Sequence, residues 1–345
     1  MRKTTQQKTF PYAYARVCAM KAKLISKNEY HKLLKVDLPS ITRFLGESEY
    51  KSEITKLSAE YDGIELVDRA LKKNEEKTYN KLRKICPNEI VDVINLYLSK
   101  ADFQNLKIVL RGIYSNSNKK DVMSIIEPVG KFNKAHFEKL FDMGSILKIL
   151  LKSKIVTPKV IQEAYDDYKE GKNLIKLENS LDKIFYQNAI DGCKKIDNHG
   201  ATFKEFLLRE IDTVNIINLL RFKKEKIDQK DVYKHLIVHG LRINKMDLKR
   251  LSAKDSIEAL YNELKKTYYG KHVKFEGDIT EVELQLKKYH MKNSALKNYK
   301  NPLSFVNILS FMMRKVVEVK NIRSLVKSKH LGIDADYVEK KLLVI

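Results

Sequence analysis

Few residues in this sequence have the type and spacing that metal binding or catalysis requires. His235 and His239 stand four residues apart, so on a helix both imidazoles would face the same way and could ligate a metal. No third ligand lies close to them in the sequence, and we interpret the two histidines as a surface pair. Cys193 and His199 lie six residues apart in a polar stretch, and we interpret their proximity as incidental.

The sequence also lacks the motifs of common catalytic and nucleotide-binding sites. It contains no P-loop, no G-x-G-x-x-G fingerprint, no G-x-S-x-G elbow and no H-E-x-x-H zinc motif. The cysteines Cys18, Cys86 and Cys193 are far apart and form no C-x-x-C pair. We therefore expect no catalytic residues, no metal and no cofactor, and a reducing intracellular compartment fits the unpaired cysteines.

One decamer pattern with several polar positions recurs three times. It consists of an acid, two residues, Asn, Leu or Ile, two residues, two aliphatic residues and a base. Its acid, asparagine and base are Asp102, Asn105 and Arg111, then Asp212, Asn215 and Arg221, then Glu318, Asn321 and Lys327. The copies are offset by 110 and 106 residues. We take these nine residues as the structural signature of the chain.

A second motif has the same period. A Ser-Ile pair followed by two further apolar residues begins at Ser40, Ser145 and Ser256. It precedes the decamer by 62, 67 and 62 residues. A period near 110 exceeds the roughly 20–50 residues of a solenoid repeat and matches a small domain. We therefore predict a flexible N-terminus at 1–9 and three similar repeats at 10–120, 121–232 and 233–345.

The decamer places special demands on the helix that carries it. Its acid and asparagine are three residues apart and share one face, on the same stripe as the aliphatic residues. A buried Asn without hydrogen-bond partners would cost about 1–3 kcal/mol, so we expect each Asn to be buried and bonded within its own repeat. The base lies near the helix end, where it complements the dipole. These requirements indicate residues that lock helices together.

The composition favours an all-α fold with a basic surface. Only 12 Gly and 6 Pro interrupt 345 residues that are rich in Lys, Glu, Leu and Ile. The Ser-Ile segments are typical of helix starts, and Asp37 with Pro39 would form an N-cap and a first turn. The formal net charge of +23 favours a polyanionic neighbour, such as nucleic acid, anionic lipid or an acidic protein.

The triplicated decamer resembles the C-subunit family of archaeal A-type and bacterial V/A-type ATP synthases, whose eukaryotic counterpart is the d subunit of the V-ATPase. Three further segments agree with this resemblance. They are the opening segment from Tyr12 to Val17, the central segment from Phe206 to Asn215, and the closing segment from Phe311 to Ile333. The third copy departs from the pattern, because Glu318 and Lys327 replace Asp and Arg there.

The resemblance implies three similar helical domains arranged with pseudo-threefold symmetry as a funnel. It implies a non-catalytic subunit that links the proteolipid rotor ring in the membrane to the central stalk subunits. In that position the subunit transmits torque for proton- or sodium-driven ATP synthesis. It is a monomer within a hetero-oligomeric complex, peripheral to the cytoplasmic side of the cell membrane, and it does not bind nucleic acid.

The alternative interpretation is a basic all-α nucleic-acid-binding protein. That class requires Lys and Arg clustered along one face together with aromatic side chains for stacking. The 18 tyrosines are dispersed and the basic residues occur mostly as scattered pairs, which counts against this class. A steep decline of affinity with salt on a random duplex would support it.

Overall fold

The computed structural model describes residues 9–156, 158–169, 174–196, 199–227, 229–300 and 305–343. Every regular element in these ranges is an α-helix or a short 3-10 helix, which confirms the all-α prediction. No helix within these ranges is both long and apolar enough to cross a bilayer. The predicted flexible N-terminus lies almost wholly outside the described residues.

The contacts between residues divide the chain into two compact units. Unit 1 combines Met1–Val91 with Lys287–Ile345, and unit 2 is Asp92–Leu286. The division falls within two long helices, α6 (Asn88–Tyr114) and α16 (Ile279–Lys300). The predicted division into three repeats at 120 and 232 is a different partition of the chain, and it stays a prediction.

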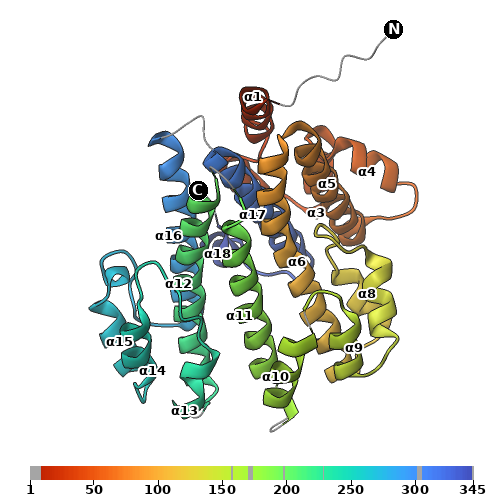
Figure 1. The fold of residues 1–345 in the computed structure, drawn as a ribbon. Coiled ribbons are helices and arrows are strands. Elements are labelled where there is room, and N and C mark those ends of the chain that lie inside the picture. Colours follow the sequence, from red (N-terminus) through yellow and green to blue (C-terminus); the bar gives the residue numbers. More distant parts are fainter. Residues whose placement is uncertain are drawn as a thin grey trace. The chain divides into compact units, whose positions relative to one another are not determined.

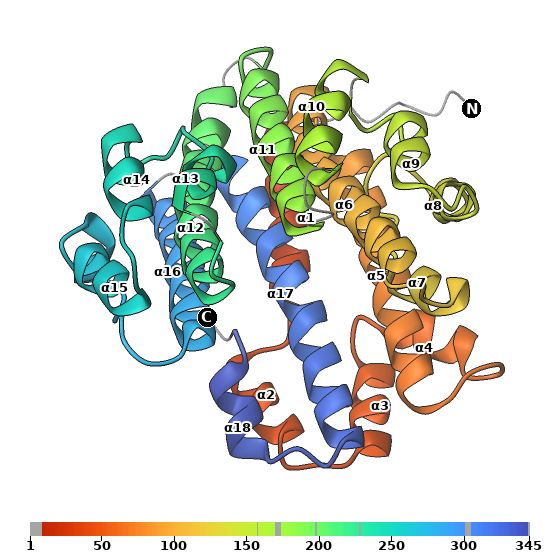
Figure 2. The ribbon, with the colours of Figure 1, turned by 90° about the horizontal axis from the view of Figure 1, so that it is seen from below.

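Unit 1 is built from both ends of the chain (Figures 1 and 2). Its complete helices are α1 (Phe10–Lys21), α2 (Lys27–Leu33), α3 (Leu38–Glu47), α4 (Lys51–Leu57), α5 (Gly63–Ile85), α17 (Phe305–His330) and α18 (Ala335–Lys341). Helix α17 packs against α1, α3 and α5. One apolar core joins Ile41, Leu45 and Leu71 of the N-terminal helices to Ile322 and Leu325 of α17. Burial of that shared surface holds the two chain segments together.

Unit 2 is a continuous series of helices. In chain order it contains α7 (Lys119–Ile125), α8 (Lys134–Phe141), α9 (Ile146–Lys152), α10 (Pro158–Lys169), α11 (Leu174–Cys193), α12 (Gly200–Lys224), α13 (Gln229–Val232), η1 (Tyr233–His235), α14 (Lys245–Ser252), α15 (Ile257–Lys265) and η2 (Tyr268–Lys271). Helix α11 packs against both α10 and α12. Phe185 and Phe203 lie in its core, each at most 2% exposed.

The Ser-Ile segments begin helices, as the sequence predicts. Ser145 and Ser256 are the N-cap residues of α9 and α15. The Ser256 hydroxyl accepts a hydrogen bond from the Ala259 N–H, whereas the Ser145 side chain forms no capping hydrogen bond. In the first copy the cap is Asp37, whose carboxylate accepts from the Ser40 N–H at 3.0 Å. A capped start satisfies a backbone donor that has no partner within the helix.

The three helices that carry the decamer end in the same way. Helices α6, α12 and α17 each close with a turn in which one residue has a positive φ. These residues are Asn116 at 51°, Lys226 at 52° and Gly332 at 65°, each 14 positions after the decamer acid. The backbone N–H that follows bonds back across the turn in each case, as Ile227 does to the Phe222 carbonyl at 3.0 Å. Only Gly332 adopts this conformation without steric cost.

We therefore expect Lys226→Gly to raise the free energy of unfolding by about 0.5–1 kcal/mol. The substitution removes the clash of a left-handed Lys, and the greater entropy of unfolded Gly offsets part of the gain. The reverse change, Gly332→Lys, should destabilise the protein. Urea denaturation of both variants measures the two effects, and a loss of stability in Lys226→Gly would contradict the interpretation.

Candidate functional site

The nine signature residues lie on the three long helices α6, α12 and α17, where their polar groups hold backbone segments elsewhere in the chain. We call each set of contacts made by one decamer helix a clasp. The first clasp is made by α6 and the second by α12, both within unit 2. The third clasp is made by α17 within unit 1. Each clasp contains an asparagine contact, a carboxylate contact and an ion pair.

The asparagine contact is the same in all three clasps. Each side-chain amide donates to a backbone carbonyl and accepts from the N–H of the same residue, 22 positions further along the chain. The pairs are Asn105 with Glu127 (2.8 and 3.0 Å), Asn215 with Ile237 (2.7 and 2.9 Å), and Asn321 with Leu343 (3.1 and 3.1 Å). The three asparagines are at most 4% exposed, which confirms their expected burial.

Two of the asparagines do not bond within their own repeat, contrary to our expectation. With boundaries at 120 and 232, Glu127 and Ile237 belong to the repeat that follows the one carrying the asparagine. The first two bonds therefore link consecutive repeats instead of closing a repeat on itself. The sequence could not distinguish these alternatives, because a backbone peptide pairs with Asn whatever its side chain is.

The carboxylates of the first two clasps hold the chain just before a following helix. Asp102 accepts from the N–H groups of Lys131 (2.8 Å) and Phe132 (3.2 Å), immediately before α8. Asp212 accepts from Arg242 (2.7 Å) and Ile243 (3.2 Å), immediately before α14. The Asp212 carboxylate also accepts from the Tyr269 hydroxyl at 2.9 Å.

Glycines allow the backbone to approach these two carboxylates. A Cβ added to Gly130 would lie 2.4 Å from an Asp102 oxygen, and one added to Gly240 would lie 2.0 Å from an Asp212 oxygen. Both distances are far shorter than any van der Waals contact, so a larger residue would push the loop away. The two loops therefore require glycine where they cross the carboxylate.

The third carboxylate has different partners. Glu318 accepts hydrogen bonds from the Ile25 N–H and from the Tyr50 hydroxyl, each at 2.6 Å. Ile25 lies just before α2. Lys315, one helical turn away, completes a buried ion pair with Glu318 at 2.9 Å. The Lys315 ammonium also lies 4.2 Å from the centre of the Tyr50 ring. These three side chains are each at most 4% exposed, so the charges depend on one another for stability.

The ion pairs join each decamer helix to an acid on another helix. Arg111 makes a bidentate contact with Glu178 on α11, and Arg221 makes one with Glu283 on α16 at 2.8 and 3.0 Å. In the third clasp Arg323 contacts Asp68 on α5 at 2.7 Å. Lys327, the expected base, forms no ion pair within the described ranges. The cation of this clasp thus lies one turn earlier than the motif predicts.

Burial changes the acidity of two clasp carboxyls. Loss of solvent raises the pKa of Asp102, although the Lys131 and Phe132 N–H groups oppose that rise. Burial raises the pKa of Asp212 to about 6 against the opposing hydrogen bonds from Arg242 and Tyr269. Burial and the neighbouring Glu318 raise the pKa of the Tyr50 hydroxyl, which therefore stays protonated and can donate.

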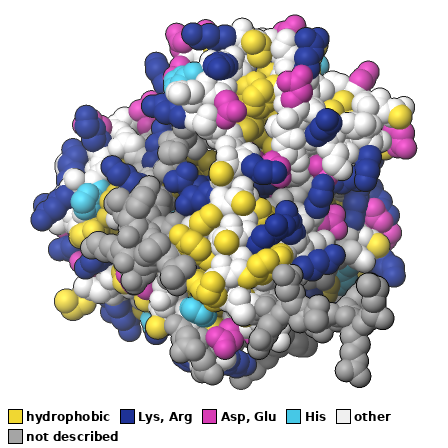
Figure 3. All heavy atoms as spheres, turned by 90° about the horizontal axis from the view of Figure 1, so that it is seen from above, with side chains coloured by type: hydrophobic (Ala, Val, Ile, Leu, Met, Phe, Trp, Pro, Cys, Tyr) yellow, Lys and Arg dark blue, Asp and Glu magenta, His cyan; other side chains and the backbone are white. Residues whose placement is uncertain are grey.

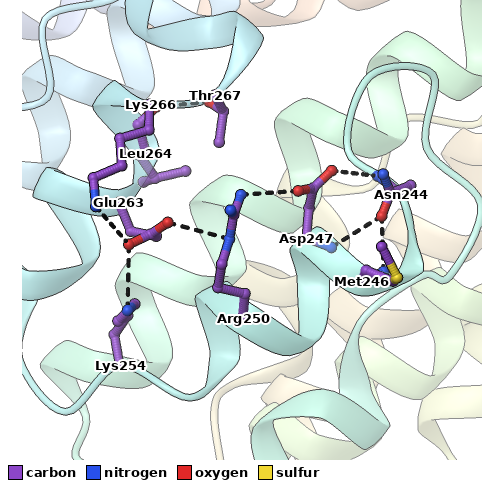
Figure 4. A network of polar contacts seen from close by, with 9 residues as sticks. All are labelled: Asn244, Met246, Asp247, Arg250, Lys254, Glu263, Leu264, Lys266 and Thr267. Carbon is purple, nitrogen blue, oxygen red and sulfur yellow. Dashed lines mark hydrogen bonds and ion pairs between the residues drawn. The ribbon is translucent and has the colours of Figure 1, made fainter.

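A further polar network holds α14 against α15 (Figure 4). Glu263 contacts Arg250 at 3.1 Å and both Lys254 and Lys266 at 3.3 Å. Arg250 also contacts Asp247, which caps the same helix together with Asn244. Hydrogen bonds from Lys254 and Lys266 hold the pKa of Glu263 below its usual value. The decamer and Ser-Ile motifs contain none of these residues.

The histidine pair differs from its sequence interpretation. His235 is only 5% exposed, and its ring lies 6.1 Å from that of Phe222. The helical turn ends at His235 and the next residue is extended, so His239 is not one turn further along a helix. The expectation of a surface pair was therefore wrong for His235. No cluster of three or more potential metal ligands was found among the residues that the structure describes.

Sequence reasoning missed several clasp residues, and only some of them left a signal. The acids Asp68, Glu178 and Glu283 precede the next decamer acid by 34, 34 and 35 residues, a spacing that could have identified them. Tyr269 and Lys315 occur in single copies, so repetition could not reveal them.

The described residues form an all-helical protein whose repeated polar residues hold helices and loops together. The sequence pattern of the ATP synthase (C/AC39) subunit family matches residues 13–341. The chain therefore belongs to this family, which confirms the resemblance seen in its motifs.

Curated relatives cover nearly the full length. The C subunit of the A-type ATP synthase of Methanosarcina mazei is 30% identical, with 97% of this chain and 93% of the relative aligned. The proteins of the same name from Haloferax volcanii and Archaeoglobus fulgidus are 29% and 28% identical, covering 97% of this chain and 97% and 96% of theirs.

Replacing the central asparagine should destabilise the fold. Asn215→Leu removes both bonds to Ile237 and leaves a buried N–H and carbonyl unpaired, so we expect a loss of about 1–3 kcal/mol. Chemical denaturation measures this loss. Asn28→Leu, at an exposed position of α2, is the control and should change stability much less. Equal stability of the two variants would show that the amide contact contributes nothing.

The raised pKa of Asp212 predicts a pH effect with a definite sign. Its unfolded pKa is near 3.9, so between pH 4 and 6 the folded state binds the additional proton. The contribution of Asp212 to the free energy of unfolding is greatest below pH 4 and is lost as pH rises through 6. As pH rises across this window, the free energy of unfolding of the wild type should fall by about 1 kcal/mol per pH unit relative to that of the non-titrating variant Asp212→Asn. Unfolding measured at several pH values tests this, and the opposite slope would mean that hydrogen bonding outweighs burial.

Proposed function

We propose that this protein is the central-rotor adaptor of an A-type ATP synthase. It links the proteolipid ring in the membrane to the central stalk and transmits torque for proton- or sodium-driven ATP synthesis. The family match over residues 13–341 is the observation that carries this proposal. The names of the relatives aligned over 97% of the chain support it.

The clasps support a mechanical role. An asparagine–backbone pair at a constant separation of 22 residues recurs in each decamer helix. The first and second clasps tie one repeat to the start of the next, and the third ties α17 to Ile25 near the start of the first. We infer that the three repeats are related by pseudo-threefold symmetry. Hydrogen bonds that tie one repeat to the next resist shear between them, as a torque adaptor requires.

The same residues support a non-catalytic role. Each signature acid and asparagine is at most 4% exposed and forms hydrogen bonds within the fold. Their polar groups are used to hold backbone and neighbouring side chains. In this proposal ATP chemistry belongs to other subunits, and this chain contributes stiffness and interfaces.

We place the adaptor at the cytoplasmic surface of the membrane as a peripheral subunit. The net charge of +23 would favour that position beside anionic headgroups. On the face drawn in Figure 3, Lys and Arg side chains are spread among acidic and apolar ones. We therefore expect the basic surface to assist association more than it fixes the partner, because peripheral charges act mainly on the association rate.

Depletion of this chain from its own membranes tests the proposal. ATP hydrolysis by the catalytic head should continue, whereas ATP-driven ion transport into vesicles should be lost and should return when purified chain is added. A tagged chain should also co-purify with a small hydrophobic proteolipid and a stalk subunit from detergent-solubilised membranes. Chain with the exposed substitution Asn28→Leu should restore transport fully. Ion transport that is unaffected by depletion would refute the adaptor role.

A further inference from the structure

A cavity of about 300 Å³ lies beside the third clasp, within unit 1. Part of its wall is made by the clasp itself, through Ile25, Glu318, Asn321 and Leu343. The rest of the wall contains basic and aromatic side chains from α1, α2 and α17. The cavity is thus bounded by segments from both ends of the chain.

Comparison with the other two clasps shows why a cavity lies beside the third one. In the first, the backbone partners of Asn105 and Asp102 are joined by a short loop that contains Gly130. In the second, Gly240 lies in the equivalent loop and also packs directly on its carboxylate. In the third, the partners Leu343 and Ile25 are not joined by a loop, because they belong to opposite ends of the chain. A cavity lies beside the Glu318 carboxylate there.

Three basic side chains line the cavity. Lys21 at the end of α1, Lys27 at the start of α2 and Arg314 on α17 all line it. None of the three forms an ion pair with any residue that the structure describes. The one acid in the wall, Glu318, is already neutralised by Lys315 and accepts from Ile25 and Tyr50. Three cations therefore face the cavity without a compensating anion among the described side chains.

One buried donor in the wall is unsatisfied. The Arg314 Nε has no hydrogen-bond partner within the described ranges, whereas the Tyr30 hydroxyl lies within reach of the Asn321 side chain. Burial and the charge of Arg314 both lower the pKa of Lys21, as expected for two cations held near each other. Buried donors are normally paired, and unpaired ones indicate a function or a ligand.

We propose that this cavity binds a phosphate group, held by Arg314, Lys21 and Lys27. A phosphate offers several acceptor oxygens and two negative charges, which match the three cations and the unsatisfied Arg314 donor. Arg suits this role because its planar guanidinium can donate two parallel hydrogen bonds to phosphate oxygens. The bound group would contact α1, α2 and α17, and so connect the two ends of the chain.

Calorimetric titration of the full chain with inorganic phosphate, against chloride at equal ionic strength, tests the site. Binding should be saturable, and thermal unfolding should shift upward with phosphate. Arg314→Gln and Lys21→Gln should each weaken binding about tenfold or more, since each removes a charge-assisted hydrogen bond. Lys56→Gln, at an exposed position of α4, is the matched control and should bind like the wild type.

A second readout separates a binding role from a structural one. Without phosphate, Arg314→Gln should unfold at the same temperature as the wild type or higher, because it relieves repulsion from Lys21. A purely structural arginine would lower that temperature. Glycerol 3-phosphate and vesicles containing phosphatidic acid then distinguish a soluble phosphate ester from a lipid headgroup as the source. The absence of saturable binding in every arm, or an equal loss in Lys56→Gln, would overturn the proposal.

Discussion

The reciprocal hydrogen-bond pair between an asparagine and one backbone peptide is the constraint on which the rest of the structure depends. A side-chain amide both donates and accepts, so it matches the N–H and carbonyl of Glu127, Ile237 or Leu343 as another peptide would. Sliding the helix by one residue breaks both bonds at once and exposes two unsatisfied backbone groups. Each pair therefore fixes the register between a long helix and a segment 22 residues away.

The carboxylate contact makes the same register more costly to change. Asp102 and Asp212 each hold two consecutive N–H groups in front of a helix, and glycine lets the backbone lie against the acid. Glu318 has the longer side chain and reaches a segment at the other end of the sequence. Its charge is balanced by Lys315 instead of by a second backbone donor, so the third clasp depends on an ion pair where the others depend on a loop.

Local signals predicted much of this structure from the sequence. Asp37 and Ser256 begin helices because their side chains accept hydrogen bonds from nearby backbone donors, and the asparagines are buried because they lie on apolar stripes. The partners across space could not be predicted in this way. Arg323 and Lys327 are four residues apart on one stripe, and only the packing of α17 against α5 decides which reaches Asp68.

The discontinuity of unit 1 has a consequence for how the chain acquires its structure. Unit 2 is one continuous segment, whereas unit 1 needs residues separated by 293 positions, as in the bond from Ile25 to Glu318. Closing so long a loop lowers the chain entropy before the native contacts that offset this loss have formed. We therefore expect unit 1 to fold more slowly than unit 2. During synthesis the apolar faces of the N-terminal helices remain exposed until α17 has left the ribosome and can pack against them. We therefore expect aggregation and chaperone binding to be concentrated in nascent unit 1 and not in unit 2.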